Sequence, residues 1–198
     1  NYGMFTGIIE SIGKIESLND NGGDIQVSVQ YDNNKLKNLE LGESISVNGV
    51  CLTLVNFNDI NLKFDISSES LDKINIFRVN DHVNLETSLK FNGKISGHFV
   101  FGHVDGIAEL IDINQKNSCE VWVIKVPNSL IKYIANKGSI SINGVSLTIN
   151  EINNGIFKIN LIPFTLAHTS FKFNKINDSL NIEVDMLARY VETILAKN

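Results

Sequence analysis

The chain has 198 residues with a formal net charge of −5, and 43% of its residues are hydrophobic while 20% are charged. This composition is sufficient to bury a core and differs from that of disordered segments. The negative charge, without a Lys/Arg cluster, argues against nucleic acid as a partner, and no run of about 18 apolar residues predicts a membrane span.

Two further features of composition bear on location and surface. We expect no export leader, and the two cysteines, Cys51 and Cys119, are too few for a disulfide framework and favour a cytoplasmic location. Asparagine is unusually frequent, which we interpret as compositional drift that places many asparagines on the surface.

Three turns flanked by alternating apolar residues are the clearest local elements in chain order. Residues 44–53 read SISVNGVCLT, and residues 139–148 read SISINGVSLT. Alternation around Asn-Gly predicts a β-hairpin, because both turn residues tolerate positive φ. Asn153-Asn154-Gly155 makes the next turn, before a strand predicted over residues 156–162. The pattern predicts an all-β fold, either a small barrel or a sandwich.

Helices are expected to be few and brief until the end of the chain. One follows Pro127-Asn128 and ends at Gly138, with an apolar face made of Leu130, Ile131 and Ile134. Residues 186–198 then change to a helical period, with an apolar stripe formed by Leu187, Tyr190, Val191, Ile194 and Leu195. This helix is predicted to serve self-association.

The whole chain reads as an internal duplication. The two hairpins are 95 residues apart, as are residues 7–10 (GIIE) and 102–105 (GHVD), while residues 79–86 (VNDHVNLE) match residues 176–183 (INDSLNIE) at a spacing of 97. Register kept over roughly sixty residues predicts two copies of one domain. We expect an N-terminal barrel over residues 4–92, a C-terminal barrel over 93–185 and a helix over 186–198, with the boundary in the polar stretch 88–96.

The copies differ at a few positions. Four pairs stand out: Cys51 with Ser146, Ile8 with His103, Gly42 with Lys137, and Ser88 with Asp185. Two related pockets with different side chains suit two molecules of one ligand held in different roles.

Several candidate sites have simpler interpretations. His98 and His103 are five residues apart, so on a strand they point to opposite faces, and no third ligand lies at zinc spacing. Residues 97–103 lack the Lys-Ser/Thr of a phosphate-binding loop. A structural role is more common than a nucleophilic one for a lone cysteine such as Cys51. Asp185, between Val184 and Met186, is either a helix N-cap or a catalytic group.

The ordered motifs resemble those of the riboflavin synthase α-chain family from Met4 to the final helix. They comprise residues 4–10 (MFTGIIE), 42–53 (GESISVNGVCLT), 97–106 (GHFVFGHVDG), 137–148 (KGSISINGVSLT), 161–166 (LIPFTL) and 181–185 (NIEVD). The sequence departs from the family's usual residues at Ser70, Ser96, Phe101 and Phe164.

The resemblance implies a fold and a reaction. The fold is two tandem six-stranded Greek-key β-barrels with a C-terminal helix, in a homotrimer whose active sites lie between the first barrel of one subunit and the second barrel of a neighbour. The reaction is the dismutation of two 6,7-dimethyl-8-ribityllumazine molecules into riboflavin and 5-amino-6-ribitylaminouracil by four-carbon transfer, without a cofactor or metal. An association with lumazine synthase is also implied.

The resemblance places site residues by position. Lumazine contacts in one half-site are expected from Gly7, Ile8, Ile9, Cys51, Leu52, Thr53, Asp65, Ile66, Ser67, Ser68, Glu69 and Ser70. The facing half-site is expected to contain Gly102, His103, Val104, Lys137, Ser146, Leu147, Thr148, Leu161, Ile162, Pro163, Phe164, Thr165 and Leu166. The positions tied to catalysis are Phe5, Ser44, Cys51, His103 and Asp185.

Within this set, roles follow from the chemistry. The C7 methyl of one lumazine must lose a proton, and we expect His103 to move it. The hydroxyls of Ser146 and Thr148, with backbone N–H groups, are expected to stabilise the resulting anion. Asp185 with Ser44 is expected to activate a nucleophile or water across the interface. Holding two rings face to face can supply roughly 7–11 kcal/mol of the barrier.

Two other functions compete with this one. A non-catalytic lumazine- or flavin-binding antenna shares the fold, but it needs one ligand where catalysis needs two. A flavin-binding reductase barrel is disfavoured, because the chain has no Gly-rich strand–turn–helix unit for a nicotinamide cofactor.

Overall fold

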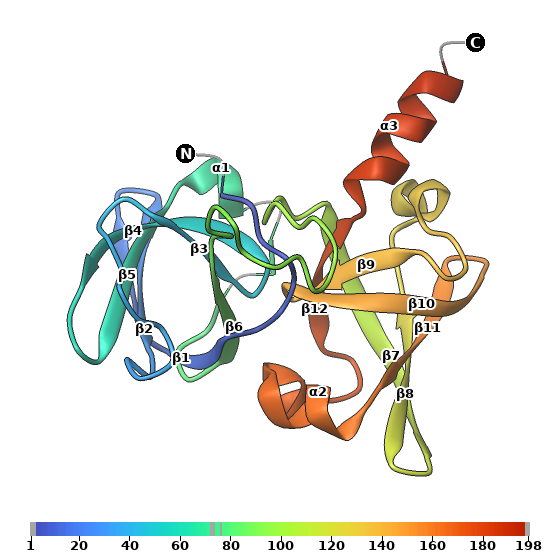
Figure 1. Ribbon diagram of the computed structural model, residues 1–198, viewed down its shortest axis with the longest axis horizontal. Coiled ribbons are helices and arrows are strands. Elements are labelled where there is room, and N and C mark those ends of the chain that lie inside the picture. The colour runs from blue at the N-terminus through green and yellow to red at the C-terminus, as the bar shows by residue number, and fades with distance from the viewer. Residues whose placement is uncertain (1–2, 72–73, 76, 197–198) are drawn as a thin grey trace.

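The computed structural model describes residues 3–71, 74–75 and 77–196. Two closed antiparallel barrels lie side by side, and the last helix projects away from them (Figure 1). The first barrel contains β1 (Ser11–Asn21), β2 (Asp24–Gln30), β3 (Ser44–Val47), β4 (Val50–Phe57), β5 (Asn61–Ile66) and β6 (His82–Thr87). The second contains β7 (Gly106–Lys116), β8 (Cys119–Lys125), β9 (Ser139–Ile142), β10 (Val145–Asn153), β11 (Ile156–Leu161) and β12 (Ser179–Val184).

The two barrels repeat one topology down to their irregularities. The first closes in the order β1-β2-β5-β4-β3-β6, and the second has the same cyclic order. The register of β1 against β2 shifts between Ile15 and Ser17, and that of β7 against β8 shifts between Leu110 and Asp112. Such bulges bend a strand and increase its twist, which helps a short sheet to close. The predicted fold of two tandem six-stranded barrels is confirmed.

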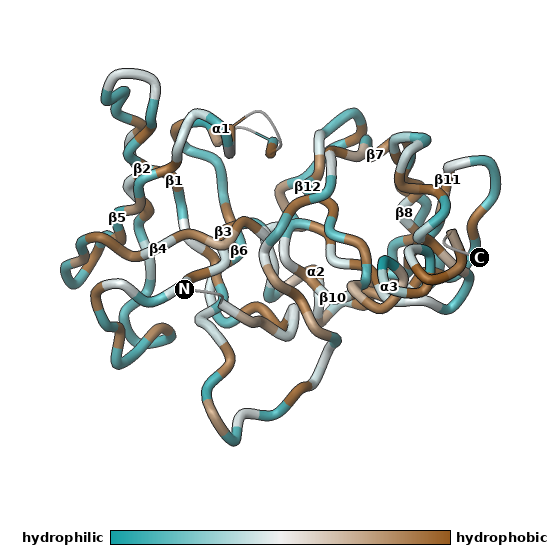
Figure 2. Tube along the Cα trace, turned by 90° about the horizontal axis from the view of Figure 1, so that it is seen from above, coloured by the Kyte–Doolittle hydropathy of each residue, from teal (hydrophilic) through white to brown (hydrophobic). Residues whose placement is uncertain are grey.

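Each barrel encloses its own core. Burial alternates along strands such as β11, where every second side chain is buried, and hydrophobic and hydrophilic residues are interspersed along both barrels in Figure 2. Phe64 and Leu62 are fully buried in the first core, and Trp122 and Phe157 in the second. The Trp122 ring packs against Phe171 with 4.9 Å between centroids, tilted by 56°, which is a favourable aromatic geometry. Because each hydrophobic core is enclosed within one barrel, polar groups can occupy the space between the barrels.

Asparagine has structural roles that composition alone did not reveal. Among the described residues, eight of the nine non-glycine residues with positive φ are asparagine, including Asn48 and Asn143 of the two hairpins. Asparagine tolerates this conformation better than most residues. Asn84, Asn143 and Asn181 are also almost fully buried. The expectation that the asparagines lie on the surface through compositional drift is therefore wrong for these positions.

The helical segments are short except for the last. They are α1 (Ser68–Leu71), η1 (Asn128–Tyr133), α2 (Pro163–His168), η2 (Ser170–Phe173) and α3 (Met186–Leu195). The helix predicted after Pro127 is a 3₁₀ helix that ends at Ile134 in an extended conformation. No described helix is long and apolar enough to cross a membrane.

The terminal helix α3 is attached to the second barrel by charged groups and not by its apolar stripe. Arg189 pairs with Asp105, and Lys132 pairs with Glu192. The stripe residues Leu187, Tyr190, Val191, Ile194 and Leu195 are all more than half exposed. An exposed apolar stripe of this kind is typical of a face that packs on another chain.

Candidate active site

Two equivalent segments meet between the barrels. Phe5 and Val100, which are 95 positions apart, form an antiparallel bridge. The Phe5 N–H donates to the Val100 carbonyl at 2.7 Å, and the Val100 N–H donates to the Phe5 carbonyl at 3.1 Å. This reciprocal pairing relates the two repeats by a pseudo-twofold axis.

From this bridge, each segment continues onto the opposite barrel. The Ser146 N–H donates to the Gly7 carbonyl at 2.8 Å, and the Cys51 N–H donates to the Gly102 carbonyl at 2.9 Å. Ile9 packs on the core of the second barrel and Val104 on that of the first. The expected grouping of Gly7 with Cys51 is corrected by this exchange, because the contact of Gly7 is with Ser146.

Glycine is required where the segments cross. Gly7 has φ of +77°, and a Cβ there would lie 2.5 Å from the Ser146 Cβ. Gly102 has φ of +71°, and a Cβ there would lie 2.6 Å from the Cys51 Cβ. Both distances are too short for any side chain. Each loop can therefore lie directly on the strand that follows the Asn-Gly turn of the other repeat.

A buried glutamate holds each loop by its backbone. Glu86 accepts from the N–H groups of Thr6 at 2.7 Å and Gly7 at 3.0 Å. Glu183 accepts in the same way from Phe101 at 2.7 Å and Gly102 at 2.8 Å. Burial raises the pKa of both carboxyls to about 7, although the N–H donors favour the ionised form.

These glutamates were not predicted from the sequence as functional. The available signal was their repetition: each is the last residue of the matched segments that end at residues 86 and 183. An acidic residue kept at the same place in an apolar strand of both repeats indicates a buried partner for backbone donors. The two carboxylates support the loops that carry the predicted contacts.

His98 is the second group that the sequence analysis missed. Its Nδ1 lies 2.7 Å from the Ser146 Oγ. Burial lowers the pKa of His98, with Asp185 opposing the shift, so the ring is neutral at pH 7 and can accept the Ser146 proton. His98 and His103 lie in the loop before β7, not on a strand. The argument that they point to opposite faces of a strand therefore does not apply.

The structure confirms one of the two interpretations that the sequence left open for Asp185. Its carboxylate accepts from the Leu187 N–H at 3.0 Å and so caps α3. Its charge also acts on the pKa of His98, in the direction opposite to burial. A catalytic role for Asp185 stays a prediction.

Comparison with known proteins identifies the repeats. The model of the lumazine-binding domain matches residues 6–88 and again residues 101–185. The chain belongs to the lumazine-binding domain family.

Full-length relatives extend this result. The chain is 40% identical to riboflavin synthase of Photobacterium phosphoreum over 97% of this chain and 89% of the relative. It is 39% identical to that of Bacillus subtilis (strain 168), over 98% and 91% of the two chains. Among solved structures, LumP complexed with riboflavin superimposes with a TM-score of 0.83 at 28% identity, covering 91% of this chain and 98% of that one.

The first lumazine-binding repeat carries one set of predicted contacts. Cys51, Leu52 and Thr53 lie on β4, and residues 65–70 span the end of β5 and α1. The loop of residues 102–104 meets Cys51, whose thiol is free and partly exposed. The side chains of Leu52 and Ile66 are buried. The side chain of Ser70 lies outside the described residues.

The second lumazine-binding repeat carries the other set. Ser146, Leu147 and Thr148 lie on β10 beside residues 7–9, and residues 161–166 lead from β11 into α2. Ile162 and Phe164 are exposed at this end of the barrel, whereas Leu161 is buried. Lys137 is exposed and has φ of +63°, and its N–H donates to the Ile149 carbonyl at 2.8 Å.

The five predicted catalytic positions are spread over these surroundings. Phe5 is fully buried and Ser44 nearly so, and Ser44 pairs with Thr53 across β3 and β4. We refer to the surroundings of Cys51 and the loop of His103 as the first pocket, and to those of Ser146, His98 and Asp185 as the second pocket, because these are the predicted lumazine sites. Phe5 lies at the crossing of the loops, where it bridges to Val100.

Proposed function

We propose that this chain is a riboflavin synthase that converts two molecules of 6,7-dimethyl-8-ribityllumazine into riboflavin and 5-amino-6-ribitylaminouracil. The observation that carries the proposal is the exchange of the loops at Gly7 and Gly102, which gives Ser146 and Cys51 equivalent neighbours from the other repeat. The full-length identity of 40% with a riboflavin synthase supports it. One lumazine gives up a four-carbon unit and the other accepts it, so the two substrate molecules account for all atoms of both products without a cofactor.

The second pocket suits the lumazine that loses a proton from its C7 methyl. With neutral His98 as the acceptor, the Ser146 Oγ can take that proton while its own passes to the His98 Nδ1 at 2.7 Å. The resulting anion is delocalised over the ring, where the Thr148 hydroxyl and backbone N–H groups can stabilise it as preorganised donors. The predicted contacts of residues 146–148 thereby gain a chemical role.

The first pocket suits the other lumazine, which gives up its four-carbon unit. Cys51 and the loop of His103 lie beside it, and we expect His103 to give a proton to the ring nitrogen of this lumazine that the four-carbon unit leaves behind. Asp185 and Ser44 belong to different barrels, so their joint activation of a nucleophile or water requires a neighbouring subunit.

Stacking of the two rings requires pockets from two subunits, as in a trimer. The exposed stripe of α3 supplies an apolar face for that assembly. A cytoplasmic location agrees with the two free cysteines, and association with lumazine synthase would bring the substrate to the site.

A single incubation tests the function. Purified protein is given 6,7-dimethyl-8-ribityllumazine alone, and riboflavin is followed by its absorbance while 5-amino-6-ribitylaminouracil is quantified by chromatography. We expect both products in equal amounts with no other reactant added. If the protein retains lumazine but forms neither product, the proposal that it is an enzyme is wrong.

The alternative is a non-catalytic antenna. Its support is the structural likeness to LumP, including LumP complexed with 6,7-dimethyl-8-(1'-D-ribityl) lumazine at a TM-score of 0.80 and 26% identity. The two functions differ in stoichiometry, because catalysis needs both pockets of each composite site occupied and an antenna needs one. Titration with a non-reacting lumazine analogue separates them.

A further inference from the structure

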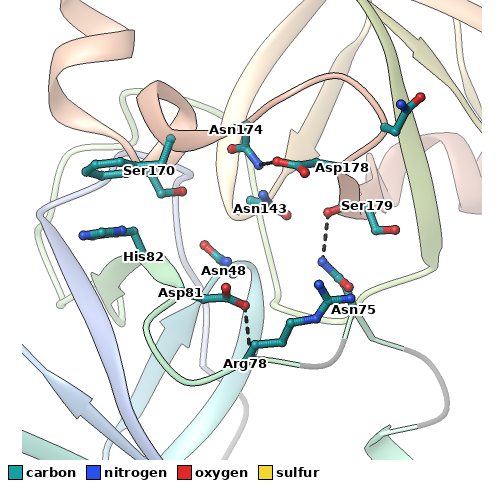
Figure 3. Close-up of a pocket in the computed structure, with 12 residues that line it drawn as sticks. Asn48, Asn75, Arg78, Asp81, His82, Asn143, Ser170, Asn174, Asp178 and Ser179 are labelled. Carbon is teal, nitrogen blue, oxygen red and sulfur yellow. Dashed lines mark hydrogen bonds between the residues drawn. The ribbon is translucent and has the colours of Figure 1, made fainter.

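A polar pocket between the barrels has no part in the proposed reaction. It has a volume of about 220 Å³, and its walls come from both repeats (Figure 3). Both repeats supply lining residues: Asn48, Asn75, Arg78, Asp81 and His82 from the first, and Asn143, Ser170, Phe173, Asn174, Asn177, Asp178 and Ser179 from the second. None of the predicted lumazine contacts lines it. Pockets for drug-sized ligands run from roughly 300 to 1,000 Å³, so this one suits a smaller molecule.

The rim of the pocket is built from two equivalent turns. The Arg78 N–H donates to the Asp81 Oδ2 at 2.9 Å, and the Lys175 N–H donates to the Asp178 Oδ2 at 2.8 Å. In each carboxylate, Oδ2 holds the turn, and Oδ1 has no hydrogen bond from another described residue. Two fixed carboxylates therefore keep one acceptor oxygen each.

Two buried polar side chains also keep unused hydrogen-bonding groups. Asn143 is 5% exposed and Ser170 is 3% exposed. The Asn143 Oδ1 accepts from the Asn181 N–H at 2.8 Å, and the Ser170 N–H donates to the Asn84 Oδ1 at 2.6 Å. These bonds fix both residues, while the Asn143 Nδ2 and the Ser170 Oγ have no partner in the described part of the chain. Both residues line the pocket, so a ligand or water there can bond to these groups.

One wall is a pair of stacked rings from the two repeats. His82 stacks on Phe173 with 3.7 Å between centroids and 13° between planes. Burial lowers the pKa of His82, and the nearby Lys14 and Lys172 lower it further, so its ring is uncharged at neutral pH. This wall offers an apolar surface together with the two ring nitrogens of His82, for which the described residues supply no hydrogen bond.

The charges of the lining oppose each other. Arg78 and Asp81 lie in one turn on the first repeat's side of the pocket, and Asp178 lies on the second repeat's side (Figure 3). An anion would approach both carboxylates, and a cation would approach Arg78. A hydroxyl group suits both, because it donates to a carboxylate oxygen and accepts from an amide or guanidinium N–H. Several hydroxyls on a short carbon chain match this lining without burying a charge.

We propose that the inter-barrel pocket binds a small uncharged polyol of about five carbons, held between the Asp81 and Asp178 carboxylates and the Asn143 and Arg78 donors. The hydroxyls take the unused donors and acceptors, and the carbon chain packs on the His82–Phe173 wall. The site is separate from the two lumazine-binding pockets, and its occupancy does not depend on turnover.

Ribitol is the probe that tests this proposal on the full chain. Saturation-transfer NMR should detect ribitol with a dissociation constant on the order of 1 to 10 mM, as expected for a ligand of this size. 1,5-Pentanediol, which lacks three of the hydroxyls, should give no signal at the same concentration. Absence of ribitol binding at 50 mM, or equal binding of the diol, would overturn the proposal.

Variants locate the binding. Arg78→Gln and Ser170→Ala remove one donor each and should weaken ribitol binding at least about fivefold, whereas the surface variant Lys116→Gln should leave it unchanged. Near-ultraviolet circular dichroism verifies that each variant is folded. Undiminished binding in both folded pocket variants would place ribitol elsewhere and overturn the proposal. If the wild-type protein binds ribitol but forms no riboflavin, the proposed function is wrong and the proposed polyol site is still supported.

Discussion

The two repeats share the features that fold them and differ in the features that meet a ligand. Glu86 and Glu183 hold equivalent loops by equivalent N–H groups, and the strand bulges recur at equivalent places. Within the pockets, Cys51 replaces Ser146, and Ile8 replaces His103. The comparison teaches that the scaffold was constrained in both copies, while the groups facing the pockets were free to take separate roles.

A second difference lies at the ends of the barrels. After β6 the chain continues through Ser88 into the linker, whereas after β12 Asp185 begins α3. The same aspartate acts on His98 in the second pocket. Only the second repeat therefore joins its pocket to the helix with the exposed apolar stripe.

The sharpest test of this comparison replaces one histidine in each pocket. We expect His98→Gln to lower kcat about 10²-fold, because Ser146 loses the group that takes its proton. Deuterium exchange into the lumazine C7 methyl, followed by NMR, should slow in parallel. His103→Gln should lower turnover while leaving that exchange intact.

The two histidine variants act as controls for one another. Substrate affinity, measured by lumazine fluorescence, should change little in either, since neither substitution alters ring packing. Unchanged turnover in His103→Gln would remove His103 from the mechanism. Fast methyl exchange in His98→Gln would remove His98.

The pH dependence of stability should be the same in both repeats. Burial raises the pKa of Glu86 and Glu183 from 4.5 to about 7. Stability from each protonated carboxyl is fully present below pH 4.5 and is lost as the pH rises through 7, by about 3 kcal/mol per group at 1.36 kcal/mol per pH unit.

Denaturant unfolding between pH 4.5 and 8 measures this loss. Glu86→Gln and Glu183→Gln should each remove a similar part of the pH dependence, because a glutamine does not titrate. Carbon-13 titration of the two carboxyls gives an independent check, and a midpoint near the ordinary glutamate value for either would contradict the effect of burial.

The asparagines between the barrels should contribute equally from both sides. Asn84 accepts from the Ser170 N–H at 2.6 Å and donates to the Asn143 carbonyl at 2.9 Å. Asn181 makes the same pair of bonds with Asn75 and Asn48, at 2.7 and 2.9 Å. Asn84→Ala and Asn181→Ala leave buried backbone groups unsatisfied, so each should lower the free energy of unfolding by about 2 kcal/mol.

Urea unfolding of the three proteins tests this symmetry. The exposed Asn114→Ala serves as a control, expected within about 0.5 kcal/mol of the wild type. A loss confined to one of the two buried positions would show that the barrels are not held together symmetrically.

The smallest expected effect concerns a backbone conformation that glycine adopts without strain and lysine adopts at a cost. Gly42 and Lys137 occupy equivalent positions with φ of +84° and +63°. Gly42→Lys should lower the free energy of unfolding by about 1 kcal/mol, because a Cβ is strained there. Lys137→Gly should raise it by less, since glycine also gains freedom in the unfolded chain. Calorimetry measures the change in the free energy of unfolding for both variants. Changes of the same sign would contradict the structural equivalence of Gly42 and Lys137.

The fold could be predicted because its signals are local or repeated. Alternation around Asn48-Gly49 and Asn143-Gly144 predicts hairpins, and the constant spacing between the copies predicts tandem domains. The type of the short helix after Pro127 was harder to predict, because a 3₁₀ helix and an α-helix begin with similar residues.

The composition of each pocket could not be predicted in the same way. That Gly7 lies on Ser146 and not on Cys51 depends on contacts between residues more than 130 positions apart. The partner of His98, Ser146, is 48 positions away and on the far side of three strands of the same repeat. Residue types were visible in the motifs, but their pairing was decided by how two closed barrels meet.

The crossing of the loops has a consequence for the origin of the molecule. A barrel whose pocket is completed by the other copy's loop cannot finish that pocket by itself. Two chains of a single repeat could do so by exchanging loops reciprocally, but their encounter would depend on concentration. Joining the copies into one polypeptide removes that dependence, and it releases the two ancestral loops from having to be identical.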